Sequence, residues 1–414
     1  MNRLGASAIA LLLIVAACGD DDATPTTTTP RPPTATTVPP STTTDPTTAT
    51  SPTTTNGDTT TTAPAPTTAP TTSSAPDDPR FVGPAEMGVA FIGGAGCFPG
   101  SFDPIPGEEI AVAPGAKGAG IPGDPTSLAV GACSAVPGQT VRLAPGIYRT
   151  SVVLGAFEGP ITIAGGDGVV LDGDGIRTTG IGLVESSGFV ITGIEFRGYA
   201  DAGLYTLLGS DVEITGNRFV DNGRASTLAD NFGEGFGLDV VGTENVVIQG
   251  NVAERNGPSE ERMADAILGT GINTFEMVDG VIRDNVSRDN HGGGILVEEG
   301  IGVVVEGNVV GGNRLDAAGD WWDGAIWVDG GRDVVIRGNT ITGNAGPGLQ
   351  LSDEEDAYPA RSVGYVVEGN VITDNLYGIY VWGWGTCPDP PDDAVVFGGN
   401  EVSGNTVADR WCED

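Results

Sequence analysis

A repeated pattern constrains the fold of this chain more than any other feature. The unit is apolar-x-apolar-x-Gly-Asn-x-apolar-x-x-Asn, and one copy runs from Val212 to Asn222. Its first Asn recurs at positions 217, 251, 285, 308, 339, 370 and 400, and a second Asn always follows five residues later. Copies that lie 23 to 34 residues apart suit the coils of a solenoid. Stacked coils of this kind bury a shared core of Val, Ile and Leu.

A third short alternating run follows the copies, as in Gly294–Val297 and Gly378–Val381. Three short strands separated by Gly and Asn turns give each coil three faces. Asn suits the turns because it tolerates the left-handed backbone region, and stacked amides can hydrogen-bond along the axis. We interpret these Asn residues as structural; the alternative is a polar ladder exposed to a ligand.

The repeats resemble the right-handed parallel β-helix superfamily, which includes pectate lyases and related polysaccharide-active proteins. The segment from Thr126 to Arg149 is similar to the capping helix and first strand of that fold, and the likeness covers residues 126–405. It implies an all-β, right-handed, single-stranded parallel β-helix. We expect an N-terminal cap region in residues 79–140 and the β-helix with a C-terminal cap in residues 141–414.

Four cysteines remain in the chain besides Cys18, an even number that indicates disulfides in an exported protein. Three pairings are open. We favour Cys97 with Cys133 and Cys387 with Cys412, because the two ends of a solenoid lie far apart.

The N-terminus has the features of an export signal, with Arg3 followed by a short apolar run. The sequence Val15-Ala16-Ala17-Cys18-Gly19 resembles the bacterial lipobox, which implies residues 1–18 as a signal peptide and a lipid on Cys18. Residues 19–78 are rich in Thr and Pro and lack apolar periodicity, so we expect a disordered stalk. The predicted location is the extracellular face of the membrane, with the lipid as anchor.

The formal net charge of −36 argues against a nucleic-acid partner, because phosphate backbones are bound through Lys and Arg. Cations and neutral polymers stay open as ligands. We expect a monomer.

Insertions indicate where a site could form, since loops on one face of a solenoid often build its binding surface. Insertions at residues 223–234, 257–269 and 314–323 all precede the third strand, and a fourth at 353–361 follows it. They should flank a groove over the outer face of that strand. The predicted outward residues at its centre are Tyr205, Asp239, Asn273, Leu296, Trp327, Gln350 and Tyr380. Two residues further on they are Leu207, Val241, Phe275, Glu298, Asp329, Ser352 and Trp382.

Aromatic rings beside amides and carboxylates suit sugars, so we predict substrate contacts from Tyr205, Asp239, Asn273, Trp327, Gln350, Tyr380 and Trp382. The alternative is a secondary apolar cluster covered by the loops. Arg262 and Arg361, both in insertions, could neutralise a uronate; surface arginines that offset local acid are the simpler interpretation.

Glu298 and Asp329 should be neighbours on adjacent coils, with backbones about 4.8 Å apart. Carboxyls about 5 Å apart match the retaining glycosidase arrangement. Glu299, Asp323 and Asp353 lie near in sequence and could complete an oxygen-ligand Ca²⁺ site. Three interpretations stay open: a catalytic pair, a Ca²⁺ site, and a solvated acidic surface.

Catalytic motifs of the superfamily are missing from the repeats. The Asp-Pro-His-Asp motif of mannuronan epimerases and the polygalacturonase motifs are absent, so no family catalytic residue is carried over. His291, the single histidine, follows Asn290 and is interpreted as a turn residue, with catalysis as the alternative.

The leading hypothesis is a cell-surface lipoprotein whose β-helix binds an extracellular polysaccharide. Cleavage by a lyase or glycoside hydrolase reaction is an extension of that hypothesis. The rival is a non-enzymatic adhesin or cell-wall scaffold that displays the same solenoid.

Overall fold

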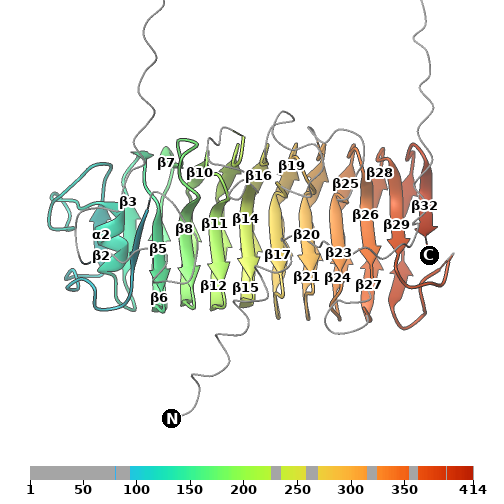
Figure 1. Ribbon diagram of the computed structural model, residues 1–414, viewed down its shortest axis with the longest axis horizontal. Coiled ribbons are helices and arrows are strands. Elements are labelled where there is room, and N and C mark those ends of the chain that lie inside the picture. Colours follow the sequence, from blue (N-terminus) through green and yellow to red (C-terminus); the bar gives the residue numbers. More distant parts are fainter. Residues whose placement is uncertain are drawn as a thin grey trace, which may run out of the picture. The chain divides into compact units, whose positions relative to one another are not determined.

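The repeat forms three parallel sheets that wind together as a β-helix (Figure 1). The computed structural model describes residue 80 and residues 94–224, 235–257, 269–314, 324–353, 362–387 and 389–413. The predicted signal peptide, Cys18 and the stalk lie outside these residues. Within the described part, no helix is long and apolar enough to cross a bilayer.

Sheet A contains the predicted third strand of each coil, with eleven strands in the described residues. Its strands are β1 (Ala95–Cys97), β5 (Val152–Gly155), β8 (Thr179–Val184), β11 (Ala202–Leu207), β14 (Phe236–Val241), β17 (Ile272–Phe275), β20 (Ile295–Glu298), β23 (Ile326–Asp329), β26 (Pro347–Ser352), β29 (Tyr377–Trp382) and β32 (Ala408–Glu413).

Sheet B contains the strand that precedes the first Asn of each repeat. Its strands are β2 (Glu109–Val112), β3 (Thr140–Leu143), β6 (Glu158–Ala164), β9 (Ser187–Thr192), β12 (Ser210–Thr215), β15 (Glu244–Gln249), β18 (Val281–Arg283), β21 (Val304–Glu306), β24 (Val335–Arg337), β27 (Tyr365–Glu368) and β30 (Val395–Gly398).

Sheet C contains the short strand between the two Asn residues. Its strands are β4 (Gly146–Tyr148), β7 (Val169–Asp172), β10 (Glu195–Arg197), β13 (Arg218–Val220), β16 (Val252–Glu254), β19 (Val286–Arg288), β22 (Val309–Gly311), β25 (Thr340–Thr342), β28 (Val371–Thr373) and β31 (Glu401–Ser403). The predicted fold class and the three strands per coil are confirmed.

The interior is a continuous column of aliphatic side chains. Inward residues of successive coils, such as Ile248, Ile282, Val305 and Ile336, are fully buried and pack directly above one another. Parallel strands buried on one face need this apolar alternation, and burial of apolar surface is the main source of stability.

Two ladders of buried Asn side chains run along the corners on either side of sheet C. In the first, Asn251 Oδ1 accepts hydrogen bonds from the backbone N–H and from Nδ2 of Asn217, at 2.9 and 3.2 Å. Asn251 Nδ2 donates to the carbonyl of Ile214 and to Asn285 Oδ1. The side-chain oxygen of Asn251 therefore accepts two hydrogen bonds, and its side-chain nitrogen donates two. The amides are satisfied although they are buried. The structural interpretation of the Asn residues is confirmed.

The second ladder ends on a different side chain. Asn405, its last Asn, donates from Nδ2 and from its backbone N–H to Asp409 Oδ1, at 2.9 and 3.3 Å. Asp409 therefore stands where the amide oxygen of a further Asn would stand. A carboxylate oxygen accepts these bonds as an amide oxygen does.

Each end of the described β-helix carries a disulfide. The six-residue helix α2 (Leu128–Cys133) lies in the segment expected for the cap, and Cys133 is bonded to Cys97 of β1. At the other end, Cys387 is bonded to Cys412 of β32. The favoured pairing of the four cysteines is confirmed.

Candidate functional site

The outer face of sheet A brings the predicted site residues into two columns. Strand pairing aligns Tyr205, Asp239, Asn273, Leu296, Trp327, Gln350 and Tyr380 in one column. The same pairs align Leu207, Val241, Phe275, Glu298, Asp329, Ser352 and Trp382 in the other. The predicted register is therefore confirmed through seven successive coils.

An open groove requires exposed side chains, but several residues of these two columns are buried. Trp327 and Tyr380 are each only 6% exposed, and Gln350 is 2% exposed. Tyr205, Glu298 and Trp382 are partly exposed. The expectation of an aromatic face open to solvent is therefore wrong at Trp327 and Tyr380, where the alternative of a covered cluster fits the structure.

The first coils of sheet A carry a small apolar cluster on the same outer face. Val153, Val184, Leu207 and Val241 are buried together there, with Phe98, Tyr205 and Phe275 packed against them. This is a secondary core outside the solenoid, of the kind the alternative interpretation described. The polar part of the face begins with Asp239 and Asn273.

Hydrogen bonds join the buried polar groups of the face to one another. Asn273 Nδ2 donates to Asp239 Oδ1 at 2.8 Å. Trp327 Nε1 donates to Ser352 Oγ at 2.7 Å, and Ser352 Oγ donates to Asp329 Oδ1 at 2.6 Å. The Tyr380 hydroxyl bonds to the carboxylate of Glu413. Gln350 Oε1 differs from these groups, because it is buried without a hydrogen-bond partner.

Glu298 and Asp329 are directly opposite each other on β20 and β23, as predicted. Their surroundings differ, since Glu298 is partly exposed and Asp329 is 4% exposed. The hydroxyl of Ser352 donates a hydrogen bond to Asp329 Oδ1. Unequal surroundings of two neighbouring carboxyls are what separates a proton donor from a carboxylate base.

Of the three predicted Ca²⁺ ligands, the structure describes Glu299 and Asp353. Glu299 occupies a left-handed turn position with φ of 51° after β20, and Asp353 Oδ1 accepts from the backbone N–H of Ser362 at 2.7 Å. Asp323 lies outside the described residues, as do Arg262 and Arg361. Where the chain is described, no three His, Cys, Asp or Glu residues cluster closely enough to hold a metal ion.

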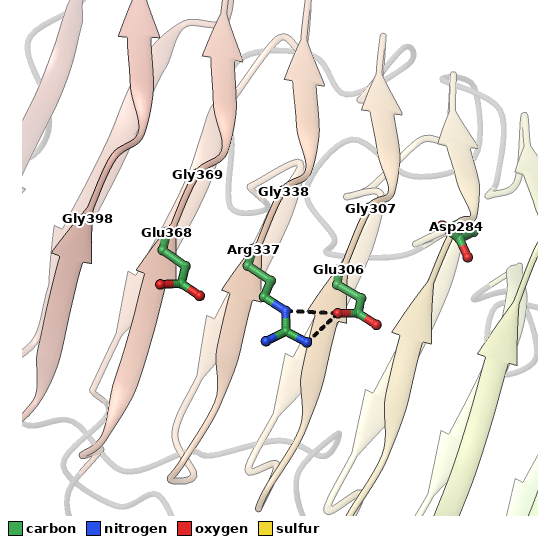
Figure 2. Close-up of a pocket in the computed structure, with 8 residues that line it drawn as sticks. All are labelled: Asp284, Glu306, Gly307, Arg337, Gly338, Glu368, Gly369 and Gly398. Carbon is green, nitrogen blue, oxygen red and sulfur yellow. Dashed lines mark hydrogen bonds and ion pairs between the residues drawn. The ribbon is translucent and has the colours of Figure 1, made fainter.

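A shallow hollow of about 550 Å³ lies elsewhere, on the outer face of sheet B (Figure 2). Its side chains include Asp284, Glu306, Arg337 and Glu368, and Arg337 bonds to Glu306 at 2.6 Å. Figure 2 shows these side chains on successive strands, with glycines beside them. The sequence interpretation did not single out this surface.

The glycines explain the hollow without a ligand. Gly338 and Gly369 precede ladder Asn residues and have φ of 63°, which favours glycine. A Cβ at either position would meet nothing within 4 Å, so backbone conformation and not space requires glycine. The hollow therefore follows from the turn that positions each ladder Asn.

The outer face of sheet C carries ion pairs. Glu254 is only 3% exposed and contacts Arg218, Arg255 and Arg288, with Arg288 at 2.6 Å. Burial acts to raise the pKa of Glu254, but the Arg288 hydrogen bond and the arginine charges outweigh it and lower the pKa. The carboxylate is ionised and fully paired, so this face is explained by structure.

Comparison with known proteins agrees with the β-helix fold. The model of the family described as the right-handed beta helix region matches residues 158–321 and 262–407. Mannuronan C5-epimerase AlgE6 of Azotobacter vinelandii is 30% identical over 206 residues, which cover 48% of this chain and 21% of that protein. Its relative AlgE1 is 31% identical over 203 residues, covering 48% of this chain and 13% of that protein.

A solved structure of similar fold is the alginate lyase of Paenibacillus sp. str. FPU-7, with a TM-score of 0.51 and 19% identity over 68% of this chain and 92% of that chain. The aligned segment spans about a fifth or less of the two epimerases. Because the family match covers more than half of the residues, the chain belongs to the right-handed β-helix family.

Proposed function

We propose that this protein binds an extracellular polysaccharide along the outer face of sheet A and modifies it at Glu298 and Asp329. The observation that carries the proposal is the alignment of these two carboxyls on adjacent strands, within columns of aromatic and amide side chains. The similar proteins are named mannuronan C5-epimerases and an alginate lyase. These names support a polysaccharide as the substrate.

The chemistry assigned to the pair follows from its asymmetry. Glu298 donates the proton to the leaving glycosidic oxygen while Asp329 attacks the anomeric carbon, and water then hydrolyses the glycosyl–enzyme bond. Asp329 is the carboxylate, because the Ser352 hydroxyl donates to it. Strands about 4.8 Å apart allow these two carboxyl groups the separation of about 5 Å that retaining glycosidases use.

Binding is tested first, on a glycan array followed by titration of each retained polysaccharide. Tyr205→Ala and Trp382→Ala, which truncate partly exposed rings, should weaken binding by roughly tenfold or more. Glu368→Gln, in the hollow of sheet B, is the matched control and should bind like the parent. Absence of binding to every glycan, or an effect of Glu368→Gln alone, contradicts the proposal.

Catalysis is tested separately on each bound polymer. Release of reducing ends would indicate hydrolysis, and rising ultraviolet absorbance from unsaturated uronates would indicate a lyase. Glu298→Gln and Asp329→Asn should each lower either activity by at least a hundredfold while binding persists. Activity that survives both substitutions would remove the pair from the mechanism.

A non-enzymatic adhesin or scaffold is the second candidate, because the burial of Trp327 and Tyr380 removes two of the predicted sugar contacts from the face around the carboxyl pair. It predicts binding without any product. The lipid anchor on Cys18 is part of both proposals, and Cys18→Ser should release the protein from the membrane fraction into the medium.

Calcium binding through Glu299, Asp323 and Asp353 stays a prediction, because Asp323 lies outside the described residues. Glu299 and Asp353 alone supply fewer oxygen ligands than Ca²⁺ takes, so no step of the proposed chemistry uses the ion. Isothermal titration of the chelator-treated protein with Ca²⁺ tests this prediction directly.

A further inference from the structure

The outer face of sheet B repeats its side chains on every second coil. Val281, Val304, Val335 and Val366 form one outward column on β18, β21, β24 and β27, and each of them is partly exposed. Two residues after these valines, Arg and Glu alternate from coil to coil, and two residues before them, Asp and Gly alternate. The outward triplets therefore read Asp-Val-Arg on the coils of β18 and β24, and Gly-Val-Glu on the coils of β21 and β27.

The alternating charges have an explanation inside a single chain, but the valines between them do not. Like charges on neighbouring strands repel, whereas Arg337 and Glu306 form an ion pair at 2.6 Å. The residues that alternate with the valines, such as Ile282 and Ile336, are fully buried in the solenoid, so the valines lie outside that core. Their column continues to Val396, which is 56% exposed. Contiguous apolar surface of this kind marks interaction sites.

The order of the charges makes this face complementary to a second copy of itself. A two-fold axis parallel to the strands, midway between β21 and β24, would reverse the order of the coils in the copy. Strand β18 would then lie over β27 of the copy, and β21 over β24. Arg283 would face Glu368 of the second copy. Glu306 would face Arg337 of the second copy, and the two valine columns would meet between these charges.

The Asp and Gly positions of these four coils would also meet without repulsion. Asp279 would face Gly364 of the second copy, and Asp333 would face Gly302. A Cβ on Gly302 would come within 2.7 Å of Asp279 Oδ1, so the aspartates and glycines form a column, as the charged residues do. Each carboxylate of that column would therefore meet a residue without a side chain.

We infer that two copies of this chain associate through the outer face of sheet B in this reversed order. The inference departs from the monomer expected from the sequence. Glu298 and Asp329 lie on sheet A, so it does not depend on the proposed function. A two-fold axis along the solenoid is the alternative arrangement. That axis would set Glu213, which is exposed and continues the valine column on β12, against itself.

The interface is small but leaves room for its charged side chains. Reversal about this axis overlaps the six strands from β15 to β30, which span roughly 25 Å at about 4.8 Å per strand. The hollow of about 550 Å³ lies on this overlap, with Glu306 and Arg337 in its lining and glycines beside them (Figure 2). Small interfaces bind weakly, so we expect a dissociation constant in the micromolar range.

Sedimentation equilibrium of the full chain tests the inference, with Cys18→Ser to keep lipid off the predicted anchor. Salt at about 0.15 M screens the long-range repulsion between two chains of net charge −36. We expect a monomer–dimer equilibrium. Val335→Asp would place a carboxylate between the valine columns and should weaken the dimer by about tenfold or more. Val309→Asp is the matched control, because Val309 is 46% exposed on β22 of sheet C, and it should leave the dimer unchanged.

Charge exchange tests the pairing across the interface. Glu306→Arg and Arg337→Glu each place like charges opposite one another and should weaken the homodimer by about tenfold. An equal mixture of the two variants restores opposite charges at both contacts and should associate at least as tightly as the parent. If Val335→Asp does not fold, this mixture decides the question.

Three results overturn the inference. The first is a parent chain that stays monomeric up to about 1 mM. The second is a dimer that Val309→Asp weakens as strongly as Val335→Asp does. The third is a mixture of the two charge variants that associates no more tightly than either variant alone.

Discussion

The two Asn ladders and the outer face of sheet A are built on the same coils, but the side chain is repeated in the ladders and varies on sheet A. In the ladders, successive coils repeat one side chain and one set of bonds, as Asn217, Asn251 and Asn285 show. On sheet A, successive coils place different side chains at one position, such as Asn273, Leu296 and Trp327. Positions that repeat are explained by folding, whereas variation at a position without loss of register shows that the coil does not require one particular side chain there.

Breaking a ladder in its middle should have the largest effect. Asn285→Ala removes the acceptor for both donors of Asn251 and leaves the carbonyl of Ile248 without its partner. Because these groups are buried, we expect a loss of about 4 kcal/mol or more in the free energy of unfolding. Chemical denaturation measures it. Asn405→Ala, at the partly exposed end of the second ladder, is the control and should cost clearly less; equal losses would contradict the assignment of the ladder as a structural element.

His291 lies at the corner between the second Asn ladder and sheet A, and its contribution to the free energy of unfolding should depend on pH. The pKa of His291 is about 4 in the folded protein and near 6.5 when unfolded, so the unfolded state binds a proton first as the pH falls. The stability contribution of the neutral imidazole is fully present above pH 6.5 and declines down to pH 4, by about 3 kcal/mol in total.

Replacement of the histidine isolates this contribution. His291→Gln should lose less stability than the parent between pH 7 and pH 4.5, as measured by denaturation in buffers without carboxylate anions. The acidic residues titrate alike in both proteins and cancel in the difference. Parallel pH profiles for the two proteins would show that the imidazole is not held neutral.

On sheet A, removal of one hydroxyl should have a moderate effect on stability. Ser352→Ala leaves Trp327 Nε1 without its acceptor and takes the Ser352 donor from Asp329. We expect a loss of about 2 kcal/mol, less than for the ladder, together with a changed pH dependence of any activity at Asp329. Ser403→Ala, an exposed serine on β31, is the control and should change neither quantity. An unchanged pH profile would reduce Ser352 to a packing residue.

A substitution in the hollow on sheet B should change the free energy of unfolding least. Glu368→Gln changes an exposed carboxylate beside Gly369, and we expect a change in stability within about 0.5 kcal/mol. Denaturation of the variant and of the parent compares the two. A larger loss would mean that this face contributes to folding in a way that its turn glycines do not explain.

The fold was predictable because each copy of the repeat indicates the same coil. The spacing of Asn217, Asn251 and Asn285 placed the coils, and alternation along the third strand placed Glu298 opposite Asp329. Cys97 was paired with Cys133 because the two ends of the solenoid that this repeat predicts lie far apart. Each of these depends on local periodicity, which a single sequence contains.

The state of the candidate site was not predictable in the same way. Alternation shows that the Trp327 side chain points outward but not what covers it, so its burial could not be read from the repeat. The approach of Arg224 to His291 links two coils through Gly257, and only packing shows it. One signal was present in the sequence: Arg314 follows Asn313 as His291 follows Asn290.

The second Asn ladder has a defined last acceptor, because the carboxylate of Asp409 accepts the hydrogen bonds of Asn405. Each amide needs an acceptor on the next coil, and Asp409 meets that need without creating a new demand of its own. Coils before Asp409 share one pattern of ladder hydrogen bonds. Deleting or duplicating one between Asn285 and Asn370 should shorten or lengthen the molecule in single steps, and the terminator would still close the ladder.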